Sequence, residues 1–256
     1  MKLSHCLEVA TEAARMAGDI IRYYADHPPV VEHKADTSPV TAADREAETA
    51  IRKHLNHAFP EHGFYGEEYG REAADAEYIW LIDPLDGTKS FVRGTPYVST
   101  QIALWHKDRS IVAVSHAPFT GETASAIRDQ GATLNGQPLQ VSSINTLRQA
   151  HLSTGNLNTL ARNHHGWQCF GDLVQRVDRL RGYGDFAHYH MLAGGKLDIV
   201  IESDVNILDI AALSLIVEEA GGKFTNLQGK AIDWNTTSAF ASNTRLHSQV
   251  LDIFAA

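Results

Sequence analysis

Cysteine is scarce in this chain of 256 residues, and the two that occur, Cys6 and Cys169, lie far apart. Two distant thiols exclude a disulfide framework and a cysteine-rich zinc site, so we expect ordinary buried thiols in a reducing compartment. Long apolar runs are missing too, because no uninterrupted stretch approaches the ~20 residues that a membrane-spanning helix needs. Glu8 and Glu12 come too early in the chain for a secretory signal peptide. These absences predict a cytoplasmic protein without membrane attachment.

Positive charge is also in short supply. Lys and Arg number 22 against 31 Asp and Glu, which gives a formal net charge of −9. This balance argues against general binding of nucleic acid or of anionic membranes. It does not exclude an anionic substrate, because bound metal ions reverse the local field.

The length suits one large domain or two tightly joined halves. The sequence shows no internal repeat. The series of predicted short strands ends around residues 142–149, where the sequence pattern changes. We therefore predict an N-terminal α+β half over residues 1–141 and a C-terminal α/β half over residues 142–256.

The most informative stretch is Trp80-Leu-Ile-Asp-Pro-Leu-Asp-Gly-Thr-Lys-Ser-Phe91. The apolar residues 78–82 predict a buried strand. We expect this strand to end at Asp83-Pro84, because proline lacks the backbone donor that a strand ladder uses. Gly87-Thr88 then supplies permissive backbone followed by a helix start.

Asp83 and Asp86 flank this tight connection. Two carboxylates this close repel each other unless something positive lies between them, and a hard divalent cation bound by oxygen atoms is the natural candidate. The backbone amides of Gly87 and Thr88 would face the same place, which suits a phosphate at a helix N-terminus. The alternative is an ordinary Asp-Pro turn followed by an Asp N-cap.

Two helices are predicted before this stretch. Apolar residues recur at three- and four-residue steps over residues 3–24, and residues 32–39 have the composition of a surface loop. Thr41 is positioned to cap a second helix, with Asp44 at position N3 in an approximate capping box. Asp44 therefore has a structural explanation as a first-turn acid, and a catalytic role needs support from elsewhere.

A second pair of acids, Glu67-Glu68, follows a short apolar strand. Taken alone, such a pair indicates solvated side chains. It gains interest because Asp83, another acid at a strand end, follows shortly after it. The polar residues 71–77 between the two are expected to form an exposed excursion.

Short antiparallel strands are predicted after the central stretch, with Asn135-Gly136 as a hairpin turn. These strands are expected over residues 97–105, 111–117, 123–127, 132–134 and 139–141. The second half is expected to hold strands over 151–154, 197–201 and 239–242 and helices over 173–180, 185–192, 209–222 and 246–254. Asp209, at the start of one of these helices, is explained on its own as an N-cap worth about 1 kcal/mol.

Four motifs that contain these acids follow one another along the chain. They are Pro39-Val-Thr-Ala-Ala-Asp44, Gly66-Glu-Glu68, Trp80-Leu-Ile-Asp-Pro-Leu-Asp-Gly-Thr88, and Asp209-Ile-Ala-Ala212 with Glu219-Ala-Gly-Gly222. In kind and in order they resemble the signatures of the inositol monophosphatase family, whose members are metal-dependent, lithium-sensitive phosphatases. The resemblance runs from about the first helix to the C-terminus.

The resemblance implies an α+β fold, a layered α-β-α-β-α sandwich of the inositol monophosphatase and fructose-1,6-bisphosphatase type. The N-terminal half would carry most metal ligands, and the C-terminal half would supply Asp209 and the substrate pocket. The resemblance also implies a homodimer.

The resemblance further implies a site that holds two or three Mg²⁺ ions. The implied ligands are Glu67, Asp83, the Leu85 carbonyl, Asp86 and Asp209. Asp44 and Thr88 would form a hydrogen-bonded pair that, with Glu67, helps activate the attacking water, and the amides of Gly87 and Thr88 would contact the phosphate. Paired cations stabilise the entering and leaving oxygens, and phosphoryl transfer needs mainly such positioning and charge stabilisation.

The substrate is suggested by two departures from the inositol enzymes. Gly87-Thr-Lys-Ser-Phe91 replaces their usual Gly-Thr-Thr-Asn-Phe and resembles the histidinol-phosphate branch, as does Arg181-Gly-Tyr-Gly-Asp185. Asp185 or Glu202 would pair with the ammonium group of that substrate, next to a contact from Asp209. The structural alternatives are a helix cap for Asp185 and a solvated strand end for Glu202.

We therefore predict a phosphomonoesterase that converts L-histidinol phosphate to L-histidinol, a step of histidine biosynthesis. The alternatives are a broad inositol-1-monophosphatase and a catalytically inactive binding homologue, which the intact set of acids disfavours. Around the last metal acid, where the family usually has an aromatic and a small residue, this chain has Ile207-Leu208-Asp209-Ile210, which predicts a more aliphatic leaving-group pocket. His188 and His190 have no metal-ligand spacing, and we assign them to a helix and leave their role open.

Overall fold

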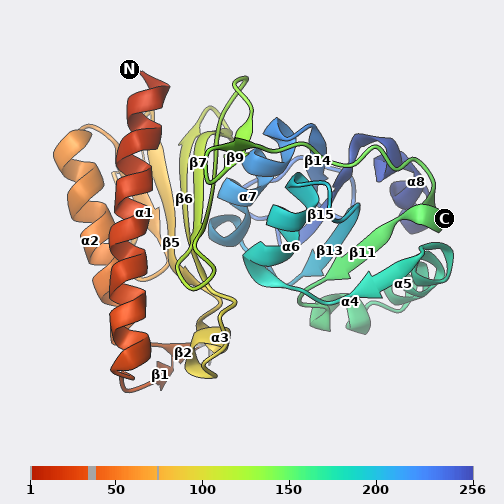
Figure 1. Ribbon diagram of the computed structural model, residues 1–256, viewed down its shortest axis with the longest axis horizontal. Helices are drawn as coiled ribbons and strands as arrows, with labels where there is room; N and C mark the ends of the chain where they lie inside the picture. Colours follow the sequence, from red (N-terminus) through yellow and green to blue (C-terminus); the bar gives the residue numbers. More distant parts are fainter. Residues whose placement is uncertain (1, 34–38, 74, 256) are drawn as a thin grey trace.

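Five layers follow one another across the molecule in the order helices, sheet, helices, sheet, helices (Figure 1). The computed structural model describes residues 2–33, 39–73 and 75–255. The helices are α1 (Leu3–Asp26), α2 (Ala42–Ala58), α3 (Thr88–Val92), α4 (Asn158–Arg162), α5 (His164–Arg176), α6 (Asp185–Ala193), α7 (Ile207–Glu219) and α8 (Thr244–Ala255), with a 3₁₀ turn at Leu147–Gln149. This is the layered α-β-α-β-α sandwich that the family resemblance predicts.

The first sheet has eight strands in the order β10-β9-β8-β7-β6-β5-β3-β4. They are β3 (Gly63–Gly66), β4 (Gly70–Glu72), β5 (Ile79–Asp86), β6 (Ser99–His106), β7 (Arg109–Ala117), β8 (Glu122–Ile127), β9 (Ala132–Leu134) and β10 (Gln137–Pro138). Neighbours are antiparallel except β3 and β5, which run parallel. Helices α1 and α2 cover the outer face of this sheet, where Ala14, Ile51 and Trp80 share one core.

Helices α6 and α7 form the middle layer (Figure 1). Helix α7 contacts β5, β6 and β7 of the first sheet and β14 and β15 of the second. Ten of its 13 residues are buried, as expected of a helix that is apolar on every side. Trp105 from the first sheet and Phe224 from the second belong to the same core cluster, so the two sheets share one apolar interior.

The second sheet has five strands in the order β12-β11-β13-β15-β14. They are β11 (His151–Thr154), β12 (Arg179–Arg181), β13 (Ile199–Ser203), β14 (Gly222–Thr225) and β15 (Ser238–Asn243). Residues of α4, α5 and α8 pack on its far face around Phe240. The predicted boundary, residues 142–149, runs between β10 and β11 and so joins the two sheets. The division into two halves stays a prediction.

Several predicted elements are misplaced. Residues 139–141 do not form the expected strand, because the hairpin ends with the two-residue strand β10. The Val141 N–H instead donates to the Ala220 carbonyl at 3.0 Å. The helix expected over 173–180 ends at Arg176, because the chain then turns and residues 179–181 pair with β11 as β12. Residues 71–73 are exposed as predicted, yet β4 pairs there with β3.

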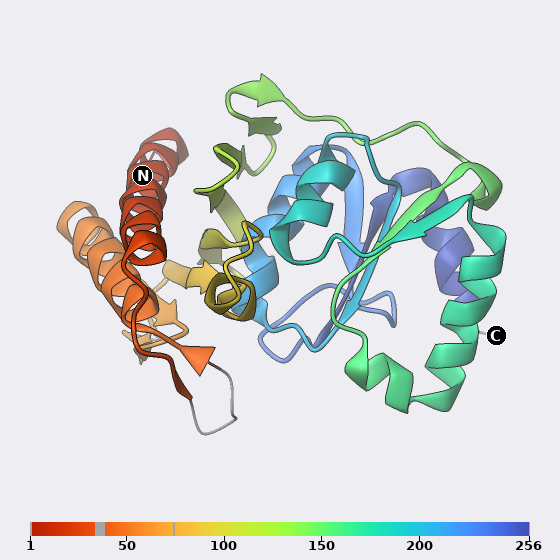
Figure 2. The same ribbon diagram turned by 60° about the horizontal axis from the view of Figure 1, so that its bottom comes forward.

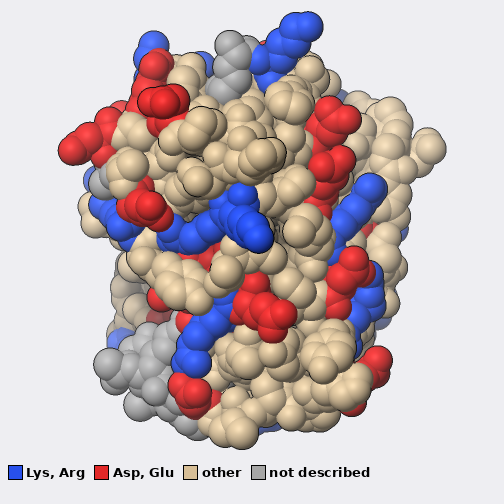
Figure 3. Space-filling view, turned by 90° about the vertical axis from the view of Figure 1, so that its left-hand side faces the viewer, with Lys and Arg blue, Asp and Glu red and all other residues tan. Residues whose placement is uncertain are grey.

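The structure also has a third sheet, of two strands. Strands β1 (Glu32–His33) and β2 (Pro39–Val40) pair with each other, and the rest of the loop predicted over 32–39 lies outside the described residues. Lys and Arg side chains lie among Asp and Glu side chains over the face formed by α1 and α2 (Figure 3). In the described ranges, no helix is long and apolar enough to cross a membrane. Cys6 and Cys169 are free and buried, as predicted.

Candidate active site

One pocket of about 550 Å³ opens where β3, β5, α3, α6 and α7 meet. Figure 2 shows α3 beside the helices of the middle layer, and the Ser90 hydroxyl of α3 lies 3.4 Å from Asp185 Oδ2 of α6. The lining residues come from both halves of the chain: Glu67, Asp83, Leu85, Asp86, Gly87, Thr88, Lys89, Ser90, Thr154, Gly155, Asn156, Gly182, Tyr183, Gly184, Asp185 and Asp209. The acids that the sequence singles out at residues 67, 83, 86, 185 and 209 thus share one cavity.

Strand β5 does not end at Asp83-Pro84 as predicted but continues to Asp86. Its pairing with β6 is irregular between Asp83 and Asp86, so Pro84 sits where the ladder is interrupted and its missing N–H costs little. The Thr100 hydroxyl donates to the Pro84 carbonyl at 2.9 Å and holds this irregular segment. The irregularity lets both acids of one strand line the same pocket.

The two acids of β5 are held by local donors. Asp83 is only 2% exposed, and its Oδ1 accepts the Leu85 N–H at 3.0 Å. Asp86 Oδ2 accepts the Ser99 hydroxyl at 3.0 Å. Gly87, with φ of +89°, occupies the N-cap position of α3, so the alternative of an Asp N-cap is wrong. A side chain on Gly87 would meet the Tyr97 carbonyl oxygen at 2.7 Å.

Glu67 reaches the pocket because β3 and β5 run parallel. Gly66 pairs with Ile82, and the Glu67 N–H donates to the Ile82 carbonyl at 3.2 Å. The carboxyl ends of parallel strands meet at the same edge of a sheet. Glu67 therefore follows its strand at the same level at which Asp83 follows Ile82.

Asp209 is not the N-cap of α7, as its own position suggested. Asn206 is the N-cap, and Asp209 occupies position N3 of a capping box. Its Oδ2 accepts the Asn206 N–H at 2.8 Å, and its Oδ1 accepts the Asn206 side-chain amide at 2.8 Å. The start of α7 thereby carries this acid to the pocket wall.

The pocket acids destabilise one another's charged forms. Burial raises the pKa of Asp83 well above its ordinary value, and the charges of Glu67 and Asp86 add to this effect. Burial and then the charge of Asp185 raise the pKa of Asp86 in the same way. Burial, with the charge of Glu67, raises the pKa of Asp209 to about 7. A cation among these carboxylates would relieve the repulsion.

Asp44 lies behind the pocket wall and contacts Thr88. The Thr41 N–H and hydroxyl donate to Asp44 Oδ2 at 2.8 and 2.7 Å, which confirms the predicted capping box. Thr88 Oγ1 lies 3.1 Å from Asp44 Oδ1 and 3.1 Å from the Leu85 carbonyl oxygen. Burial raises the pKa of Asp44, although the hydrogen bonds from Thr41 and Thr88 oppose this effect. The predicted Asp44–Thr88 pair is present.

The two acids predicted to bind the substrate differ in placement. Asp185 begins α6 and lines the pocket, with Oδ2 at 3.4 Å from the Ser90 hydroxyl. Glu202 does not line the pocket and is 4% exposed, so a solvated strand end is excluded. Its Oε2 accepts the Tyr189 hydroxyl at 2.7 Å and lies 3.1 Å from His188 Nε2. Burial and then the charge of Glu202 raise the pKa of Asp185.

One further expectation about this region is corrected, and the predicted placement of His188 and His190 in a helix is confirmed. Ile207 and Leu208 were expected to make the leaving-group pocket more aliphatic, but both pack in the central core and neither lines the pocket. His190 lies away from the pocket acids, with Nδ1 at 3.0 Å from Glu122 Oε2 and Nε2 at 2.9 Å from the Ser115 hydroxyl. His188 and His190 are therefore buried partners of acids within the fold.

The pocket's donor set fits a hard divalent cation, because it consists of carboxylates and a main-chain carbonyl. Within the described part of the chain, no three His, Cys, Asp or Glu side chains already form a group that could hold a metal ion. These acids nevertheless line one pocket.

A family model described as the inositol monophosphatase family matches residues 2–255. The chain belongs to the inositol monophosphatase family. A histidinol-phosphatase of Streptomyces coelicolor is 38% identical to it over 98% of this chain and 95% of the relative, and one of Mycobacterium tuberculosis is 39% identical over 86% of each. The solved inositol monophosphatase of Anabaena (Nostoc) sp. PCC 7120 matches with a TM-score of 0.86 and 28% identity, covering 100% of this chain and 97% of that one.

Membership of the inositol monophosphatase family makes this chain a phosphoric monoester hydrolase of a metal-dependent family. The pocket acids are the residues whose motifs carry that resemblance. Sequence reasoning missed Glu48 and Tyr189, which are buried beside the site residues Glu67 and Glu202. For Glu48 a signal was present, because it lies one helical turn after Asp44 and next to the buried Ala47.

Proposed function

We propose that this phosphatase hydrolyses L-histidinol phosphate to L-histidinol with the help of Mg²⁺. The observation that carries the substrate proposal is Asp185, an acid that lines the same pocket as the predicted metal ligands of β5. The charge of Glu202 acts on it and raises its pKa, after the larger effect of burial. The ammonium of histidinol phosphate would pair with Asp185, whereas inositol offers only hydroxyl groups. Glu202, held behind it by Tyr189 and His188, would add negative potential without direct contact.

The proposed metal site uses hard oxygen ligands. Glu67, Asp83, the Leu85 carbonyl, Asp86 and Asp209 would hold two or three Mg²⁺ ions, and the ions would supply charge stabilisation and a more acidic bound water. The amides of Gly87 and Thr88, and Asp209 itself, would orient the phosphate ester in the same pocket.

The chain's own residues would move the proton. The Thr88 hydroxyl has one proton, and donating it to Asp44 leaves its oxygen lone pairs to accept a proton of the attacking water. Burial raises the pKa of Asp44, which brings this carboxyl closer to the range of a useful general base. Glu67 would orient the same water from the other side of the pocket.

A steady-state comparison of phosphate release tests the substrate proposal. We expect kcat/KM for histidinol phosphate to exceed that for inositol 1-phosphate by tenfold or more. A tenfold preference for inositol 1-phosphate would overturn the substrate and leave the chemistry intact. That alternative, a broad inositol monophosphatase, has support from the Anabaena neighbour.

The variant Asp185→Asn isolates the proposed ammonium contact. We expect it to raise the KM for histidinol phosphate at least tenfold and to change the KM for inositol 1-phosphate less than threefold. Asp129→Asn is the matched control, because Asp129 also has a positive φ, 63° against 45° for Asp185, and does not line the pocket. Equal losses on both substrates would refute the contact. The predicted homodimer, lithium sensitivity and cytoplasmic location stay predictions.

A further inference from the structure

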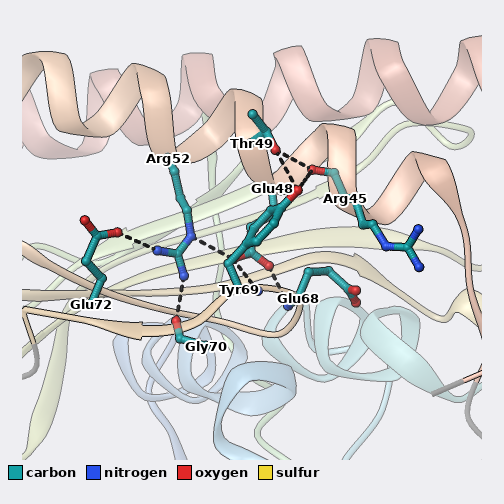
Figure 4. A network of polar contacts seen from close by, with 8 residues as sticks. All are labelled: Arg45, Glu48, Thr49, Arg52, Glu68, Tyr69, Gly70 and Glu72. Atoms are coloured by element: carbon teal, nitrogen blue, oxygen red, sulfur yellow. Dashed lines mark hydrogen bonds and ion pairs between the residues drawn. The ribbon is translucent and has the colours of Figure 1, made fainter. Parts of the chain in front are cut away.

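A charged side chain that the proposed chemistry does not use lies behind the pocket. Glu48, on α2, is 0% exposed and comes one helical turn after Asp44. Residues four apart lie on the same face of a helix, so α2 directs two buried carboxylates toward the site. Asp44 contacts Thr88, and Glu48 reaches the turn between β3 and β4 (Figure 4).

Glu48 holds this turn by its backbone. The turn consists of residues 67–69, and the first of them is the proposed ligand Glu67. Glu48 Oε2 accepts the Glu68 N–H at 2.7 Å, and Oε1 lies 3.4 Å from the Tyr69 N–H. Only a carboxylate offers an acceptor oxygen to both amides at once, because an amide side chain would turn an N–H toward one of them.

Arg52 completes the arrangement around Glu48. Its Nε donates to Glu48 Oε1 at 2.7 Å, and its Nη2 donates to the Gly70 carbonyl at 2.6 Å. Its Nη1 donates to Glu72 Oε2 at 3.2 Å on β4 (Figure 4). The guanidinium therefore balances the buried charge of Glu48 and joins α2 to β4, the strand that follows the turn.

The fit around Glu48 leaves no spare room. A Cβ placed on Gly66 would lie 1.9 Å from Glu48 Oε1, so only glycine leaves space for the carboxylate there. Gly66 immediately precedes Glu67 and ends β3. The backbone on both sides of Glu67 is thus set by contact with Glu48 or by pairing with β5.

We propose that Glu48, braced by Arg52, is a positioning residue that fixes the backbone of the Glu67 turn and thereby sets the metal affinity of the pocket. This inference rests on the proposed metal site. A backbone anchored in this way confines any adjustment to a cation to the side chain of Glu67. Without the anchor, cation binding would also have to order the turn.

The test is the Mg²⁺ dissociation constant of the full chain, measured by titration calorimetry on Glu48→Gln. We expect Mg²⁺ to bind at least tenfold more weakly, with kcat at saturating Mg²⁺ lowered less than threefold. Arg52→Lys keeps the positive charge but loses the planar guanidinium that donates to several acceptors at once, so we expect it to weaken Mg²⁺ binding less than Glu48→Gln does. If Glu48→Gln does not fold, Arg52→Gln tests the same positioning role, and we expect it to weaken Mg²⁺ binding tenfold.

The matched control is Glu218→Gln, which removes the same charge from another arginine pair, Arg128 Nη1 to Glu218 Oε2 at 2.6 Å; neither residue of this pair lines the pocket. It should bind Mg²⁺ within twofold of the wild type. A lower melting temperature of Glu48→Gln in EDTA with an unchanged Mg²⁺ dissociation constant would overturn the positioning role and leave a purely structural one. If the wild-type chain itself bound no Mg²⁺, the proposed function would fail instead.

Discussion

His247, far from the pocket, gives a prediction with a magnitude and a sign. Its ring is 1% exposed and stacks on Phe240, with ring centroids 4.1 Å apart. The Thr225 hydroxyl donates its proton to the Asn226 carbonyl at 2.8 Å, so His247 Nε2, at 3.1 Å, has to donate to Thr225. Nδ1 then accepts the Ser242 hydroxyl at 2.8 Å. Both ring nitrogens are satisfied when the imidazole is neutral.

Burial, helped by the charge of Lys223, lowers the pKa of His247 from 6.5 to about 4. The unfolded chain therefore binds a proton at this residue below pH 6.5, whereas the folded chain does so only near pH 4. The stability that the neutral ring contributes is complete above pH 6.5 and is lost as the pH falls toward 4. Between pH 7.5 and pH 5 these two pKa values correspond to a loss of about 2 kcal/mol in the free energy of unfolding.

The measurement is urea unfolding of the wild type and of His247→Gln at both pH values, in EDTA so that metal binding does not contribute. We expect the variant to be less stable at pH 7.5, because it loses the stacked ring, but to lose about 2 kcal/mol less than the wild type on going to pH 5. His57→Gln, at an exposed histidine, should follow the wild-type pH dependence. Equal pH dependence of the wild type and His247→Gln would refute the reasoning.

Three further predictions concern the site. Asp83→Asn should abolish phosphate release while far-UV circular dichroism stays that of the wild type, because a ligand is lost without a change in shape; persistent turnover would remove Asp83 from the metal site. Thr88→Ala should lower kcat by about 10²–10⁴-fold, the usual contribution of general acid–base catalysis, and a change confined to KM would argue for a binding role only. Chelation should abolish activity, and Mg²⁺ should restore it. Mg²⁺ should also raise the melting temperature of the chain, since a ligand that binds only the folded state stabilises that state. An unchanged melting temperature at saturating Mg²⁺ would contradict the proposed metal site.

The family resemblance, carried by the order of the motifs, predicts the layers and the pocket acids, whereas the local pattern around each acid favours a cap or a solvated strand end. Local rules then misjudged details that depend on tertiary partners. Pro84 was read as a strand end, yet the irregular pairing with β6 carries β5 past it. Asp209 was read as an N-cap because the competing cap, Asn206, stands three residues earlier and only the structure shows which one accepts the helix N–H.

Buried polar side chains were the hardest to predict. Glu202 resembled a solvated strand end, but Tyr189 and His188 from α6 cover it in the middle layer. Glu48 belongs to a helix whose polar residues read as a solvent face, and only the β3–β4 turn packed against it shows otherwise. Charge patterns along one element carry no information about the donors that another element brings.

Helix α7 joins the deepest part of the molecule to the pocket. It lies between the two sheets, and ten of its 13 residues are buried, so packing on both sides restricts any shift of the helix. A core substitution such as Leu215→Ala, about 1.7 turns from the acid, would therefore leave a space into which α7 can move, and Asp209 would move with it. We therefore expect substitutions in the core around α7 to weaken Mg²⁺ binding at the proposed site under conditions in which the chain is still folded.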